Sequence, residues 1–165
     1  VLLTYYNPVF RYPADRFFQE AKEIGIDGVI IPDLPGEEQQ EIRPLADENG
    51  VDIIQMVAPT SEDRIRSNVK NATGFVYVVS SMGVTGMRGS IQTDLKDIIR
   101  VIKETTDTPV AIGFGIHTPK QAKEMAALAD GVITGSGVVD IINKEGNQAD
   151  KDLMDYIGGL KKAIQ

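Results

Sequence analysis

The sequence predicts an α/β protein with a parallel sheet covered by helices. Short strand-like segments alternate with helix-like segments along the 165 residues. Each strand-like segment is apolar nearly throughout, which is typical of parallel strands that helices cover. No linker or shift in composition divides the chain. We therefore expect one domain over residues 1–165.

The expected strands are short apolar runs rich in residues that favour β-structure. The first begins at the first residue, and Pro32 ends the second. The fifth and sixth each break into glycines, at GFG and TGSG. The six predicted strands cover residues 1–6, 27–33, 51–59, 74–81, 109–115 and 131–136.

Helix-like patterns follow these strands. Residues 14–25 carry apolar side chains at helical spacing, and a glycine stops the pattern. Pro44 inside residues 37–50 predicts a kink or a division. Residues 61–72 carry two acidic side chains in the first turn. The last three expected helices cover residues 93–106, 118–129 and 150–164. The first of these has an apolar face, and the second begins with Thr118 and Pro119.

Six strand–helix units fit two architectures. One is a small open doubly wound sheet, and the other is three quarters of a (β/α)8 barrel, which takes about 250 residues. The chain opens with VLLTYYNP, a strand already under way and without an initiator Met. This start favours the barrel. We therefore expect six of its eight units, strands 3 to 8.

Composition excludes several classes of function. A formal net charge of −7 argues against a nucleic-acid-binding surface. The chain has no Cys, so disulfides and thiolate-ligated metals are excluded, and His117 is its only His. No apolar run approaches the roughly 20 residues of a membrane span. We expect a cytoplasmic enzyme or binding protein with no metal, no membrane contact and no nucleic acid.

Glycine clusters follow three of the expected strands, at residues 80–90, 113–115 and 134–137. The carboxyl ends of parallel strands are where α/β proteins bind ligands. Glycine lets the main chain approach an anion and expose its N–H groups, and helix N-termini add free donors. We predict a phosphate cup made by Gly115, Gly135 and Ser136, with Gly86 closing it from the side. The alternative is that these glycines are ordinary turn residues.

Several segments resemble one enzyme family. LLTYYNPVFRY, DGVIIPDLPGEE, VYVVSSMGVTG, PVAIGFGIHTP and DGVITGSGVV occur in the order and spacing of the tryptophan synthase α subunit family. The resemblance runs from residue 1 to about 142 and more loosely through the last helix. It implies a (β/α)8 barrel and a lyase of tryptophan biosynthesis. That family cleaves indole-3-glycerol phosphate to indole and glyceraldehyde 3-phosphate.

The resemblance also implies roles for individual residues. Residues 81–90 would form a lid over the substrate. The phosphate would lie against Gly86, Gly115, Gly135 and Ser136. Supporting catalytic roles would fall to Tyr77 and Thr85. The substrate pocket would include Leu3, Met56 and Phe114. The surface facing a β-subunit partner would include Asn7, Phe10, Asp33 and Pro35.

The resemblance implies no cofactor for this subunit, because the pyridoxal phosphate belongs to the β partner. The family's acid/base carboxylate pair has no counterpart here, and we expect it upstream of residue 1. Asp33 either faces the site or the partner, or caps the helix after PDLPGEE. His117 is either a general base or a loop residue before a helix. We expect the isolated chain to be inactive.

Two further interpretations remain open. The chain could be another barrel enzyme, such as an isomerase or epimerase of a sugar phosphate. That interpretation accounts for the phosphate cup but not for the motifs PDLP and S-x-x-G-V-T-G. The chain could also be a non-catalytic fragment that binds a phosphate ester or self-associates through open sheet edges.

Overall fold

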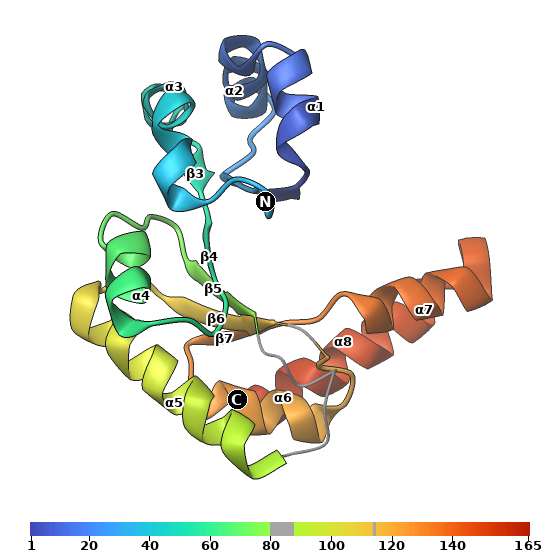
Figure 1. Cartoon of the computed structure of the whole chain (residues 1–165). Coiled ribbons are helices and arrows are strands. Elements are labelled where there is room, and N and C mark those ends of the chain that lie inside the picture. Colours follow the sequence, from blue (N-terminus) through green and yellow to red (C-terminus); the bar gives the residue numbers. More distant parts are fainter. Residues whose placement is uncertain (80–87, 114) are drawn as a thin grey trace.

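The computed structural model describes residues 1–79, 88–113 and 115–165, with the backbone alone for 88–94. Strands and helices alternate along the chain (Figure 1). The strands are β1 (Leu2–Leu3), β2 (Gly28–Ile30), β3 (Asp52–Ile53), β4 (Gln55–Val57), β5 (Val76–Val79), β6 (Val110–Gly113) and β7 (Gly131–Ile133). The helices are α1 (Tyr6–Arg11), α2 (Ala14–Glu23), α3 (Arg43–Asn49), α4 (Glu62–Val69), α5 (Arg88–Thr105), α6 (Pro119–Ala126), α7 (Ser136–Glu145) and α8 (Asp150–Ile164). Two 3-10 helices, η1 (Gly36–Glu41) and η2 (Gly146–Gln148), complete the set.

All strand pairs in the described chain are parallel, as predicted. They form two sheets, with strand orders β1-β2-β3 and β4-β5-β6-β7. The expected strand over 51–59 is divided at Ile54. Its first part, β3, pairs with β2, and its second part, β4, pairs with β5. This one segment therefore joins the two sheets.

The N-terminal segment differs from the prediction. The expected strand over 1–6 is only Leu2–Leu3, and α1 begins at Tyr6. The Asp33 carboxylate accepts a hydrogen bond of 2.8 Å from the Tyr6 main-chain N–H, a first-turn donor that the helix itself cannot satisfy. The idea that Asp33 caps the helix after PDLPGEE is therefore wrong. The residue before η1 is Pro35, and no side chain caps η1.

Other helices match the prediction in part. Residues 37–50 are divided, as Pro44 suggested, into η1 and α3. Thr118 caps α6 in a reciprocal capping box with Gln121, and Pro119 begins the helix. The helix α7 was not predicted. It has no fully buried residue, and Val139 and Ile142 are exposed.

Two apolar cores hold the chain together. One lies between β1–β3 and helices α1 to α3 and includes Val9, Phe18 and Val29. The other lies between β4–β7 and helices α4, α5, α6 and α8, which Figure 1 shows on one side of that sheet. Along β5, Val76 and Val78 are fully buried toward these helices. The opposite face of the sheet is less covered and is free to line a site.

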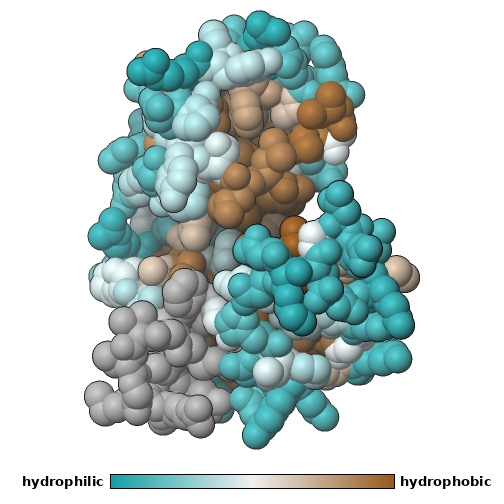
Figure 2. Space-filling model, turned by 90° about the vertical axis from the view of Figure 1, so that its right-hand side faces the viewer, coloured by the Kyte–Doolittle hydropathy of each residue, from teal (hydrophilic) through white to brown (hydrophobic). Residues whose placement is uncertain are grey.

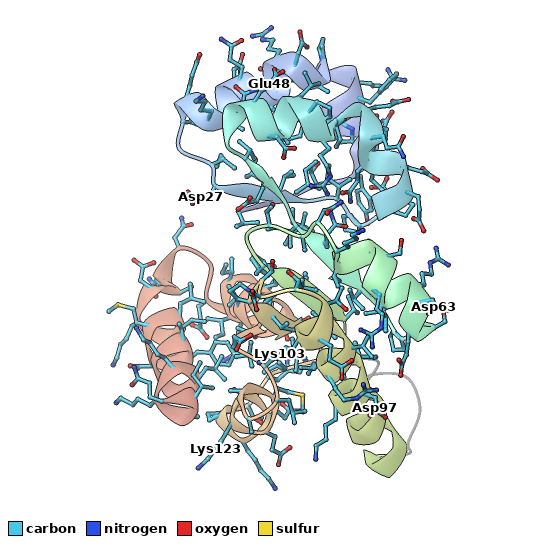
Figure 3. The ribbon with its side chains drawn as sticks, turned by 90° about the vertical axis from the view of Figure 1, so that its left-hand side faces the viewer. Asp27, Glu48, Asp63, Asp97, Lys103 and Lys123 are labelled. Carbon is cyan, nitrogen blue, oxygen red and sulfur yellow. The ribbon has the colours of Figure 1, made fainter. Side chains whose placement is uncertain are left out.

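Charged side chains lie on the outer surfaces of the helices. Figure 3 shows Glu48, Asp63, Asp97, Lys103 and Lys123 on helices α3 to α6. Many of the ion pairs join exposed groups, for which the expected stabilisation is small. No helix in the described part of the chain combines the length and hydropathy needed to cross a bilayer.

Asp130 makes a more specific contact. Its carboxylate accepts hydrogen bonds from the Val110 main-chain N–H at 2.9 Å and from Lys103 Nζ at 3.1 Å. The Val110 bond first, and then Lys103, hold the pKa of this carboxyl below its usual value. Asp130 thereby joins α5, β6 and the turn before β7.

Candidate functional site

The candidate site lies on the less covered face of β4–β7. Residues paired in parallel register point to the same face, so Met56, Tyr77, Ala111 and Gly131 form one row across the four strands. The next row, toward the carboxyl ends of β5 to β7, contains Val79, Gly113 and Ile133. This row lies close to the loops that carry the glycines.

A cavity of about 500 Å³ lies between the two sheets. Leu3 and Ile30 line it from β1 and β2, and Tyr77 and Ile133 line it from β5 and β7. The loop segment 115–117 and the segment 135–136 complete its wall. The cavity thus has an apolar side built by strands and a polar side built by main chain and the Ser136 hydroxyl.

Tyr77 occupies the strand wall of this cavity. Its side chain is half-buried, and burial raises the pKa of its phenol. The phenol is therefore protonated at neutral pH and available as a hydrogen-bond donor. A Cβ at position 113 would overlap the Tyr77 ring, so glycine at that position makes room for it. Gly113 was expected only as part of the glycine cluster at residues 113–115, and not as the residue that makes room for a tyrosine ring.

The polar side of the cavity comes from two strand-end loops. Gly115 has φ +76°, which a residue with a Cβ rarely adopts. Gly135 immediately precedes α7, and Ser136 is its first residue. Both are exposed, so the first N–H groups of α7 are open to a ligand. Beside Gly115, the Gln121 carboxamide holds the loop by accepting a 3.0 Å hydrogen bond from the His117 N–H.

The cavity therefore brings together five of the predicted residues: Leu3, Tyr77, Gly115, Gly135 and Ser136. It also includes Ile30, Ile116 and Ile133, which sequence reasoning had placed only in strands or turns. His117 lines the cavity too, although its role was left open. Among the described lining residues there is no Asp or Glu.

Two predicted residues lie in a neighbouring cavity. Met56 and Pro35 line a cavity of about 420 Å³ between the segment after β2 and the start of α4. Met56 is the register partner of Tyr77. It therefore lies next to the cavity that Tyr77 lines, although it does not line that cavity itself. The structure thus separates Met56 from Leu3, with which the resemblance had grouped it.

The other residues expected to face a partner lie together on the surface. Asn7 and Phe10 are in the short helix α1, not in a loop, and Phe10 is 65% exposed. Asp33 reaches the N-terminus of that helix through its bond to Tyr6. The predicted residues Thr85, Gly86 and Phe114, and most of the expected lid, lie outside the described residues.

No group of three His, Asp or Glu side chains in the described ranges is arranged to hold a metal ion. Glycine loops, an open helix N-terminus and a protonated phenol favour an anion with an apolar body attached. A phosphate monoester of an aromatic or aliphatic alcohol has this chemistry.

Comparisons with known proteins show the family of the chain. A sequence profile described as tryptophan synthase alpha chain matches residues 1–165. The tryptophan synthase alpha chain of Lacticaseibacillus casei is 47% identical over 164 residues, which are 99% of this chain and 62% of that protein. The chain thus spans less than two thirds of this relative.

Solved structures show the same fold. The tryptophan synthase alpha subunit from Campylobacter jejuni matches with a TM-score of 0.87 and 33% identity, covering 94% of this chain and 64% of the other. A structure of the tryptophan synthase α2β2 complex from Pyrococcus furiosus matches with a TM-score of 0.85 and 34% identity, covering 98% and 66%. These matches confirm the predicted barrel family, of which this chain is a partial copy.

Proposed function

Because the chain belongs to the tryptophan synthase alpha chain family, we propose that its cavity binds indole-3-glycerol phosphate. The reaction it would serve is cleavage of this compound to indole and glyceraldehyde 3-phosphate. The observation that carries the proposal is the single cavity that gathers Leu3, Tyr77, Gly115, Gly135 and Ser136.

The two sides of the cavity suit the two ends of this substrate. The phosphate would accept hydrogen bonds from the loop at Gly115, from the open N-terminus of α7 and from the Ser136 hydroxyl. The indole would lie against the apolar wall formed by Leu3, Ile30 and Ile133. The protonated Tyr77 phenol, on the strand wall between them, would donate a hydrogen bond near the glycerol.

The reaction requires two proton transfers. Indole C3 gains a proton, a glycerol hydroxyl loses one, and the bond between indole C3 and the glycerol carbon breaks to leave an aldehyde. A pair of carboxylates suits these roles. Since the described cavity wall carries none, we propose that the 165-residue chain binds the ester without cleaving it. The acid/base pair would come from the part of the longer relatives that this chain does not span.

A β chain is the proposed protein partner. The matched Pyrococcus furiosus structure is of an α2β2 complex. The proposed partner surface consists of four exposed residues, Asn7 and Phe10 of α1, and Asp33 and Pro35 of the segment that is hydrogen-bonded to the start of α1. We propose that this surface faces the β chain, and that the pyridoxal phosphate of the complex belongs to that partner.

Isothermal titration with glycerol 3-phosphate tests the binding step, with glycerol as the control ligand. We expect the phosphate ester to bind and glycerol not to bind. The variant Ser136→Glu places a negative charge at the first position of α7, where it favours the helix but repels a phosphate. The affinity of this variant for glycerol 3-phosphate should be at least about tenfold lower than that of the unmodified chain.

A matched variant separates local from general charge effects. Ser67→Glu adds the same charge on α4 at an exposed position that does not line the cavity. It should bind glycerol 3-phosphate as the unmodified chain does. Equal losses in both variants, or no binding by the unmodified chain, would contradict the proposed phosphate site.

A further inference from the structure

A hydrogen bond ties together the two glycine loops of the cavity. Thr134, directly after β7, donates its hydroxyl hydrogen to the Ile116 carbonyl at 2.9 Å. Each partner is next in sequence to one glycine of the cavity, Ile116 to Gly115 and Thr134 to Gly135. This contact therefore links the two loops just beyond the paired strands β6 and β7.

A side chain from the last helix completes this contact. The Tyr156 hydroxyl of α8 lies 3.0 Å from Thr134 Oγ1. A threonine hydroxyl has one hydrogen, and Thr134 gives it to Ile116, so the Tyr156 O–H is the donor in this pair. Tyr156 is half-buried and packs against the core under β4–β7. Packing of the ring against the core thus holds the hydroxyl in place.

The same tyrosine also contacts the first turn of α7. A Cβ added at Gly137 would overlap the Tyr156 hydroxyl and the ring carbon that carries it. Gly137 follows Ser136, so the phenol lies against the turn whose N–H groups face the cavity. This contact is steric and involves the ring as well as the hydroxyl that bonds to Thr134.

From these two contacts we infer that Tyr156 and Thr134 are positioning residues, which hold the loop after β6 and the first turn of α7 in the arrangement that receives a phosphate. The inference rests on the proposed function. Neither residue lines the cavity, so neither touches the ligand. Their effect is to fix donors before binding, which lowers the entropy cost of ordering them around the ligand.

The variant Tyr156→Phe tests the hydrogen bond, because it keeps the ring and removes only the hydroxyl. The affinity for glycerol 3-phosphate should fall about fivefold, and the amide resonances of Gly115, Gly135 and Ser136 should shift in NMR spectra of the free protein. Tyr12→Phe is the matched control. It removes a tyrosine hydroxyl that bonds to Glu20 at 2.6 Å on the surface, and it should change neither the affinity nor those resonances.

A double-mutant cycle tests the steric contact separately. Gly137→Ala should weaken glycerol 3-phosphate binding about tenfold when Tyr156 is present. In the Tyr156→Leu background the phenol no longer occupies the space. Gly137→Ala should then lower the affinity for glycerol 3-phosphate less than about twofold. Coupling of this size is expected for residues in contact, whereas distant and independent residues have nearly additive effects.

The outcomes distinguish the inference from the proposed function. If the unmodified chain does not bind glycerol 3-phosphate, the proposed function fails. If it binds, but Tyr156→Phe binds equally well and the Gly137→Ala effect is the same in both backgrounds, the positioning inference is wrong. Reduced affinity of Tyr156→Phe, measured where urea unfolding shows the variant to be fully folded, together with coupling in the cycle, supports it.

Discussion

Replacement of Gly115 by alanine is the sharpest test of how the main chain builds the site. Gly115 has φ +76°, and a Cβ built there would meet no atom within 4 Å. The cost of alanine is therefore conformational and not steric. For a residue with a Cβ in this region the cost is about 1 kcal/mol or somewhat more.

The strained alanine can relax by rotating its peptide toward negative φ, which would turn away from the cavity the N–H groups that we propose bind the phosphate. If about 1 kcal/mol of binding free energy is lost in this way, the affinity for glycerol 3-phosphate falls about fivefold. Isothermal titration measures this loss, and urea unfolding measures the change in the free energy of unfolding.

Gly50 provides a matched control. It has φ +65°, ends α3, and likewise has no atom within 4 Å of a built Cβ. Gly50→Ala should lower the free energy of unfolding by a similar 1 kcal/mol or so and leave phosphate affinity unchanged. Binding by Gly115→Ala as tight as that of the unmodified chain, or an equal loss of affinity in both variants, would show that the φ of Gly115 does not matter for the site.

Two carboxylates support further predictions. Because hydrogen bonds from β6 and Lys103 lower the pKa of Asp130, its contribution to stability is full above the unfolded value of about 3.9 and is lost as the pH falls through the lower folded value. In urea unfolding from pH 7 to 3, the stability difference between the unmodified chain and Asp130→Asn should therefore shrink with acid; a constant difference would contradict this. Asp33→Ala removes the side-chain acceptor at the start of α1 and should lower the stability of this helix by about 1 kcal/mol. Amide hydrogen exchange in α1 should therefore become faster. Asp15→Ala, at an exposed position of α2, is the control and should leave exchange in α1 unchanged.

Much of the fold could be predicted because it depends on local pattern. Apolar runs that lack polar alternation predicted parallel strands, and the described pairs are parallel. Thr118 and Pro119 predicted the start of α6, since capping uses atoms within one turn. Pro44 predicted the division before α3 for the same reason.

The errors arose where a distant residue decides the outcome. Tyr5 and Tyr6 favour a strand locally, yet α1 begins at Tyr6, where Asp33, 27 residues away, accepts its N–H. The single strand predicted over 51–59 is divided at Ile54, because its two parts pair with strands of different sheets. The helix α7 has no buried residue, and the pattern of its apolar side chains did not predict a helix.

The parallel α/β class, the family and the positions of the glycines could be read from the sequence, because they follow from composition, periodicity and motif. Folding in three dimensions was needed to show that Leu3 shares a cavity with Tyr77 while Met56 lines the neighbouring one. It also placed Tyr156, 22 residues away in sequence, against Thr134. Side chains from separate strands and helices meet only after the sheets curve and the helices pack, and no spacing along the chain encodes that meeting.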